Sequence, residues 1–230
     1  MARRGVVVQR GRGIRRMGLP GVAWAAGGVL FALMAALAAV RDTFPADLFL
    51  AHRWQDVDVP VLGGTLAFAN ALGFIWAAAP IMAGVIALLA LRRRWLEGGV
   101  VVLTLVPHGL QTGIKELVGR VRPSEELVRV SEEASGSGFP SGHVVGAMVF
   151  YGLVLYLTPR LIDSRPLRVV LGLFCVFMIV ATGPARVYTG AHWPSDVVGG
   201  YLFGLLCLAV LIALDRALRR PQTSRRGDSS

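Results

Sequence analysis

The residues with the clearest catalytic potential lie between positions 185 and 196. His192 and Asp196 are four positions apart, just before a long apolar run. One helical turn would bring the Asp196 carboxylate toward an imidazole nitrogen of His192. An acidic partner fixes the tautomer and orientation of a histidine and raises its basicity, so the pair predicts a nucleophile or a general base. The alternative interpretation is that Asp196 only caps the helix that follows.

A second histidine ends a short segment that could bind an anion. In Pro140-Ser141-Gly142-His143, Ser141 stands where a helix N-cap is expected. Free backbone N–H groups and the positive end of the helix dipole suit such a position to phosphate, and Gly142 lets an anion approach the backbone. His143 would then point toward whatever binds there. The alternative is an ordinary capping turn with an incidental histidine.

Three cations accompany these histidines. Lys115 and Arg122 are seven positions apart, so they project from one face if the preceding helix continues that far. A solvated helix end is the alternative. Arg186 precedes His192 in the same segment. Because a phosphate dianion and its transition state require several positive charges, the three segments together predict a site for phosphoryl transfer.

The composition indicates that membrane-spanning helices position these segments. Of 230 residues, 54% are apolar and only 17% are charged, and the mean hydropathy is +0.60. Soluble domains carry about a quarter charged residues. A helix needs about 20 apolar residues to cross a bilayer, so we expect an all-α bundle of six transmembrane helices. The expected spans are 21–40, 74–91, 96–114, 143–157, 167–184 and 197–214, with residues 59–73 at the outer interface.

The basic residues predict the orientation of these spans. A net charge of +10 would suit a nucleic-acid binder, but most of the 24 basic residues flank apolar runs, so no nucleic-acid partner is expected. With cytoplasmic termini, seventeen basic residues face inside against four acids, and seven face outside with ten acids. This is the distribution that the positive-inside rule favours. The site therefore faces the extracytoplasmic side of the plasma or inner membrane.

The chain is expected to divide into three parts. Residues 1–20 would form a basic cytoplasmic segment, residues 21–216 the six-span domain, and residues 217–230 a basic disordered tail. The first apolar run is longer than a typical signal-peptide core, so an uncleaved anchor is expected. The site residues lie in two outer loops, at about 115–143 and 185–196.

The three motifs resemble those of the type 2 phosphatidic acid phosphatases, the PAP2 family. The family pattern is K-x6-R-P, then P-S-G-H, then S-R-x5-H-x3-D. Residues 115–123 match the first motif and residues 140–143 match the second. Arg186, His192 and Asp196 match the third at the family spacing, although Ala185 stands where the family has serine. The membrane branch of this family also implies the six-span layout.

The resemblance implies a mechanism without a metal or another cofactor. The phosphate oxygens would be held by Lys115, Arg122, Arg186, the Ser141 hydroxyl and the Gly142 backbone N–H. His192, oriented by Asp196, would attack phosphorus and form a phosphohistidine, while His143 protonates the leaving group. Water would then hydrolyse the intermediate.

The resemblance also implies the partners, which are the bilayer and a lipid phosphate or diphosphate. The candidate substrates are phosphatidic acid, phosphatidylglycerol phosphate and polyprenyl diphosphate. An outward-facing site favours polyprenyl diphosphate, because it suits the recycling of a carrier lipid. Two alternatives stay open: a lipid phosphotransferase that uses the same His192, and a transporter or binder that does not hydrolyse its ligand. The sequence carries no signal for an oligomeric state.

Overall fold

Helices make up every regular element in the computed structural model, which describes residues 19–57, 59–73 and 75–219. The all-α class expected from the composition is confirmed within these residues. Expectations for residues 1–18 and 220–230, which include most of the two basic terminal segments, lie outside them. In chain order the helices are α1 (Leu19–Val40), α2 (Pro45–Gln55), α3 (Pro60–Gly73), α4 (Ile75–Leu91), α5 (Trp95–Val102), α6 (Leu105–Val118), α7 (Gly142–Leu161), α8 (Arg165–Tyr188) and α9 (Pro194–Leu218).

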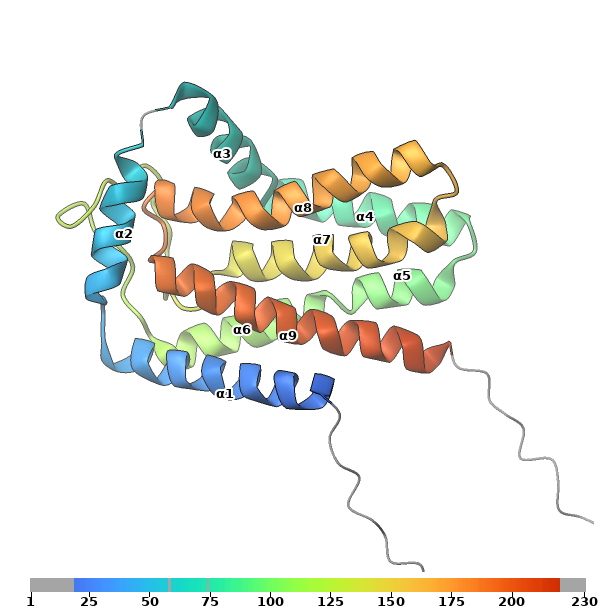
Figure 1. Cartoon of the computed structure of the whole chain (residues 1–230), viewed down its shortest axis with the longest axis horizontal. Helices are drawn as coiled ribbons and strands as arrows, with labels where there is room; N and C mark the ends of the chain where they lie inside the picture. Colours follow the sequence, from blue (N-terminus) through green and yellow to red (C-terminus); the bar gives the residue numbers. More distant parts are fainter. Residues whose placement is uncertain (1–18, 58, 74, 220–230) are drawn as a thin grey trace, which may run out of the picture.

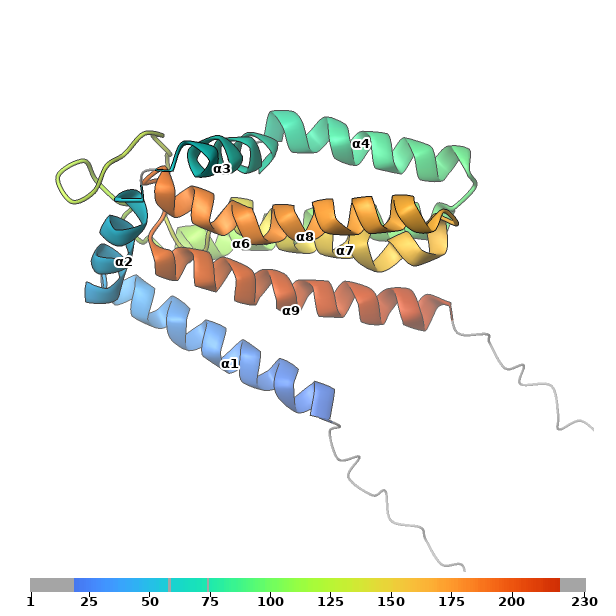
Figure 2. The ribbon, with the colours of Figure 1, turned by 45° about the horizontal axis from the view of Figure 1, so that its top comes forward.

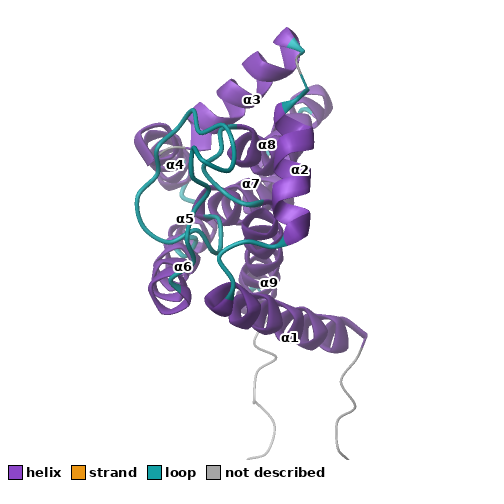
Figure 3. Ribbon diagram, turned by 90° about the vertical axis from the view of Figure 1, so that its left-hand side faces the viewer, coloured by secondary structure: helices purple, strands orange, loops and turns teal. Residues whose placement is uncertain are grey.

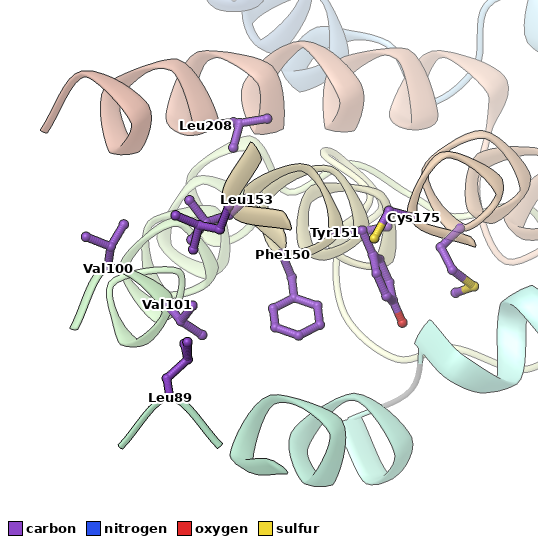
Figure 4. Close-up of a cluster of buried hydrophobic side chains, with 11 residues drawn as sticks. Leu89, Val100, Val101, Phe150, Tyr151, Leu153, Cys175 and Leu208 are labelled. Atoms are coloured by element: carbon purple, nitrogen blue, oxygen red, sulfur yellow. The ribbon is translucent and has the colours of Figure 1, made fainter. Parts of the chain in front are cut away.

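Helix α7 forms the centre of the bundle. It packs mainly against α8 and α9, while α6, α5 and α3 contact its other sides (Figures 1 and 2). Helix α1 packs along α9. A helix with apolar residues all round is buried on every side, and α7 has this character. Figure 4 shows its core, which is formed by side chains from five helices: Phe150, Tyr151, Leu153, Cys175, Leu208, Leu89, Val100 and Val101.

Glycines in α9 allow it to approach α7 closely near the N-terminal ends of the two helices. A Cβ atom at Gly200 would lie 2.9 Å from the Ser141 carbonyl oxygen. A Cβ atom at Gly204 would lie 2.8 Å from the Met148 Cβ. Small residues at a helix interface permit close backbone approach, so these glycines bring the start of α9 against the start of α7.

Four described helices are long and apolar enough to cross a membrane: α1 from Gly21, α7, α8 and α9. Helices α3 and α4 form a pair bent by 62°, which would make a fifth span if the pair crosses as one. Residues 59–73, expected at the outer interface, contain the whole of α3, which packs against α8. The count of six spans and the cytoplasmic position of the termini stay predictions.

The expected third span, residues 96–114, is divided between two helices. Helix α5 ends at Val102 and α6 begins at Leu105. Pro107 accounts for the division. It has no backbone N–H to donate to the Leu103 carbonyl, and its ring would clash with that carbonyl in a continuous helix. A proline is tolerated in the first turn of a helix, which is where Pro107 lies in α6.

Helix α2 lies across one end of the bundle (Figure 1). It contacts α8 and α9, and Figure 3 shows it beside the loops that follow α6 and α8. Asp47, Ala51 and Gln55 are its buried residues, and their spacing of four places them on one face. This end of the bundle therefore holds α2 together with both loops that contain the predicted site.

Candidate active site

The structure brings His192 and Asp196 together. Nδ1 of His192 lies 3.4 Å from Oδ2 of Asp196, and both side chains are buried. Helix α9 begins at Pro194, so His192 lies just before the helix and Asp196 lies in its first turn. Asp196 also accepts a hydrogen bond from the Trp193 backbone N–H at 3.0 Å. The carboxylate therefore both caps α9 and faces the histidine.

One cavity of about 550 Å³ contains the three predicted cations and both histidines. Lys115 and Arg122 do not share a helical face, however. Helix α6 ends at Val118 because Gly119 adopts the left-handed conformation, with φ 64°, that commonly terminates helices. Arg122 reaches the cavity from the loop beyond it. The helix does not continue as far as Arg122, so the condition for a shared face is not met, although the two charges meet.

Backbone carbonyls hold two of the cations in place. Lys115 Nζ donates a hydrogen bond to the Ser137 carbonyl at 3.0 Å. Arg122 donates from Nε to the Gly136 carbonyl at 2.8 Å and from Nη1 to the Ala191 carbonyl at 2.7 Å. The loop between α6 and α7 therefore folds back over the cavity and fixes the cations that line it.

Ser141 occupies the N-cap position of α7, as the sequence predicts, but its hydroxyl does not cap the helix. The side chain is fully buried, and within the described part of the chain its Oγ has no hydrogen-bond partner. Its backbone N–H donates to the Asp196 carbonyl at 3.0 Å, which ties the start of α7 to the start of α9. Gly142 and His143 follow it into the cavity wall. The hydroxyl is thus available to a ligand.

Burial and the surrounding cations keep His192 neutral. Burial, followed by the charges of Arg122, Lys115 and Arg186, lowers the pKa of His192 well below its ordinary value. Arg122 Nη1 lies 3.1 Å from Nε2 of His192. A guanidinium can only donate, so Nε2 is the accepting nitrogen and the proton belongs on Nδ1, facing Asp196. The neutral ring therefore carries its lone pair on the nitrogen that faces the cavity.

Opposing effects act on the pKa of Lys115. Burial lowers its pKa to about 8, with a further contribution from the positive charge of Arg122, while Asp196 opposes the shift. Burial and the charge of Arg186 lower the pKa of Arg122. Clustered cations repel one another, and an anion bound among them relieves that repulsion. The cavity is therefore electrostatically suited to a phosphate.

Arg120 is a residue that the sequence analysis counted only as an outer basic residue. Its guanidinium is buried and donates from Nη1 to Oδ1 of Asp196 at 2.6 Å. Its Nη2 donates to Oδ2 of Asp47, in α2, at 2.7 Å. The only sequence signal for Arg120 was its place inside the first motif, two positions before Arg122. Asp47 gave none beyond its place near apolar runs.

Glu132 and Asn70 were also missed as site residues. Arg186 Nη1 donates to Oε1 of Glu132 at 2.7 Å and to Oδ1 of Asn70 at 2.6 Å. Asn70 Nδ2 donates to Oε2 of Glu132 at 2.6 Å. Glu132 lies in the loop between the first two motifs, and its side chain is only 20% exposed and lines the cavity. The Glu132 carboxylate is therefore paired with Arg186, one of the predicted phosphate ligands.

Much of the remaining lining of the cavity is apolar. It is formed by side chains from the end of α3, from α4, from α6 and from α7, among them Leu72, Met82, Leu105, Ala147 and Phe150. Among the described residues, no three His, Cys, Asp or Glu side chains gather so as to hold a metal ion. The cavity therefore joins a charged part to an apolar part.

A bundle of apolar helices with two histidines and three cations in one cavity defines an integral membrane protein with a strongly basic cavity. The family model described as the PAP2 superfamily matches residues 96–220, more than half of the chain. The chain belongs to the PAP2 superfamily, which confirms the family resemblance of its motifs.

Curated relatives are matched over part of their length. The chain is 30% identical over 112 residues to phosphatidylglycerophosphatase B of Bacillus subtilis, which covers 46% of this chain and 52% of that protein. It is 32% identical over 129 residues to decaprenylphosphoryl-5-phosphoribose phosphatase of Mycobacterium tuberculosis, which covers 56% and 65%. The chain thus spans about half of the length of the first relative and not quite two thirds of the second.

A solved structure shares the fold. The crystal structure of a transmembrane PAP2 type phosphatidylglycerolphosphate phosphatase from Bacillus subtilis has a TM-score of 0.73. The match covers 86% of this chain and 98% of that chain at 24% identity. The arrangement of helices described above is therefore that of a PAP2 membrane protein.

Proposed function

We propose that this protein is a membrane phosphatase that hydrolyses a lipid phosphate or diphosphate through a phosphohistidine intermediate. The observation that supports this most is the placement of a buried His192–Asp196 pair in one cavity with Lys115, Arg122 and Arg186. A neutral histidine beside fixed positive charges combines a nucleophile with stabilisation of the transferred phosphoryl group. The names of the relatives, which are lipid phosphatases, support the same activity.

In this mechanism the cations hold the phosphate oxygens in front of His192. The lone pair on Nε2 attacks phosphorus, and the bond from phosphorus to the leaving oxygen breaks. Asp196 keeps the Nδ1 proton in place and stabilises the positive charge that develops on the ring. His143, protonated in the complex with the anionic substrate, gives a proton to the leaving oxygen. His143 then removes a proton from the water that attacks the phosphohistidine, which releases phosphate and restores His192.

The Ser141 hydroxyl and the Gly142 backbone N–H complete the phosphate site. Ser141 Oγ is buried at the N-terminus of α7 and makes no hydrogen bond within the described chain. The free N–H groups of a helix N-terminus and the positive end of its dipole favour an anion at the same place. A phosphate held by the three cations would accept hydrogen bonds from both groups.

The shape of the cavity supports an amphiphilic substrate. Its charged part suits a phosphate headgroup, and its apolar wall suits the hydrocarbon that follows. Phosphatidic acid, phosphatidylglycerol phosphate and polyprenyl diphosphate all have this form. Polyprenyl diphosphate is the preferred candidate if the site faces outward, because carrier lipids are recycled there.

Phosphate release from these three lipids, measured with purified protein in liposomes, tests the proposal. We expect release from at least one lipid, and a loss of at least about a thousandfold in His192→Ala. His52→Ala is the matched control, because His52 is exposed and its ring contacts the Leu127 carbonyl outside the cavity. No release from any lipid, or activity retained in His192→Ala, would contradict the proposal. Phosphate transferred to an added alcohol in place of water would identify a phosphotransferase.

A further inference from the structure

A buried ion network links His192 to a helix outside the region matched by the family model. Arg120 Nη1 donates to Oδ1 of Asp196 and to Oγ of Ser195, both at 2.6 Å, and Nη2 donates to Oδ2 of Asp47 at 2.7 Å. The Arg120 and Asp196 side chains are fully buried, and that of Asp47 is 3% exposed. We call these four residues the Asp47 network. Helix α2, which carries Asp47, precedes the matched residues 96–220.

Asp47 also holds the first turn of α9 directly. Its Oδ1 accepts a hydrogen bond from the Ser195 backbone N–H at 2.8 Å, and its Oδ2 accepts one from the Ser195 hydroxyl at 2.7 Å. Ser195 immediately precedes Asp196. The backbone from which Asp196 reaches His192 is therefore fixed by a side chain from another helix.

The charges of the network affect how strongly Asp196 interacts with His192. Two carboxylates share the buried Arg120 guanidinium, so its positive charge is divided between Asp47 and Asp196. If Asp47 lost its charge, the attraction of Arg120 would fall on Asp196. A carboxylate held more strongly by a guanidinium is a weaker partner for the Nδ1 proton of a histidine and for the charge that forms on its ring.

Helix α2 is anchored at both ends of its buried face, which fixes the place of Asp47. Eight positions after Asp47, the Gln55 Nε2 atom donates to the Arg129 carbonyl at 2.7 Å and to the Tyr188 carbonyl at 3.2 Å. Asp47 thus contacts the start of α9, and Gln55 contacts the end of α8 and the loop after α6. Figure 3 shows α2 lying over this end of the bundle.

We propose that Asp47 is a positioning residue for His192 that acts through Arg120, Ser195 and Asp196, so that helix α2 belongs to the catalytic apparatus. The proposal rests on the proposed function, in which His192 is the nucleophile. The network touches Asp196 and not the cavity cations Lys115 and Arg122. Asp47 should therefore affect the rate of phosphoryl transfer and leave phosphate binding unchanged.

The test compares Asp47→Asn with Asp56→Asn in the full chain, using the lipid that the native protein hydrolyses most rapidly. Asp56 lies at the C-terminal end of the same helix and is exposed. We expect Asp47→Asn to lower kcat about tenfold or more, with KM and the inhibition constant of inorganic phosphate within about twofold of native. Asp56→Asn should match the native protein in all three quantities.

A second variant covers the case in which Asp47→Asn does not fold. Ser195→Ala removes only the hydroxyl link and should lower kcat by a smaller factor, again without a change in inhibition by inorganic phosphate. Native kcat in either folded variant overturns the proposal, and so does a loss of inhibition by inorganic phosphate in parallel with kcat. A native protein that releases no phosphate from any of the lipids contradicts the proposed function itself. Native kcat in a folded Asp47→Asn variant contradicts only the positioning role.

Discussion

The Glu132 carboxylate lies 2.7 Å from the Arg186 guanidinium, inside the cavity that also contains His143 and His192. Asn70 hydrogen-bonds to both partners and holds them together. A phosphate that binds Arg186 must therefore compete with a carboxylate that already lies there. The ion pair between Glu132 and Arg186 therefore weakens the attraction of Arg186 for an anion.

Replacing Glu132 by Gln should tighten the binding of a phosphate analogue. The substitution keeps the shape of the side chain and removes the negative charge that opposes an anion beside Arg186. We expect the inhibition constant of vanadate to fall by about three- to tenfold, which corresponds to roughly 0.7–1.4 kcal/mol. Glu126→Gln is the control, because Glu126 is exposed in the same loop. An unchanged or weaker inhibition by vanadate would show that Glu132 does not compete with the anion.

The pKa of Lys115 predicts the basic side of the pH profile. Burial and the charge of Arg122 lower this pKa to about 8, so the ammonium is charged below that pH and neutral above it. A charged Lys115 is needed to hold phosphate, so kcat/KM should decline as the pH rises through about 8. Lys115→Arg should remove this decline, because arginine stays protonated. A decline that persists in Lys115→Arg would assign it to another group.

His192 should not limit activity on the acid side near neutral pH. Its pKa lies well below the ordinary value because the ring is buried beside three cations, so the ring stays neutral as the pH falls from 8 to 6. Over this range kcat/KM should therefore show no decline caused by protonation of His192. A decline in the native protein that Arg122→Gln shifts to higher pH would indicate protonation of His192.

Gly73, at the end of α3, restricts the space around His143. A Cβ atom at this position would lie 2.7 Å from Cδ2 of His143, which is closer than carbon atoms approach. Gly73→Ala should therefore displace the ring and lower kcat by about 10- to 100-fold. Gly64→Ala is the matched control in the same helix, because a Cβ atom there meets nothing within 4 Å. Equal kcat values for the two variants would show that His143 tolerates the shift.

Activity should persist when divalent metal ions are removed. The proposed mechanism takes its positive charge from Lys115, Arg122 and Arg186, which line the cavity around the histidines. Phosphate release should be the same with and without excess EDTA. Activity that is lost in EDTA and restored by added Mg²⁺ would contradict this mechanism.

Much of the site could be predicted from the sequence because its residues lie in short motifs. The N-cap pattern indicated that a helix begins at Ser141, Gly142 and His143. The spacing of four positions indicated that His192 lies near Asp196. Apolar runs of the length of a bilayer indicated the helices that carry them. These are local properties, since a helix is formed by residues three and four positions apart.

The remaining features depend on contacts between distant segments. Arg122 enters the cavity because Gly119 ends α6 and the loop beyond it folds back. Arg120 meets Asp47 and Asp196 across 73 and 76 positions of the chain, and Arg186 meets Glu132 across 54. The sequence determined which residues could bind phosphate and carry out its transfer. Tertiary structure decided which carboxylate pairs with which cation, because a buried charge must find its partner among whatever side chains the packing of the helices brings beside it.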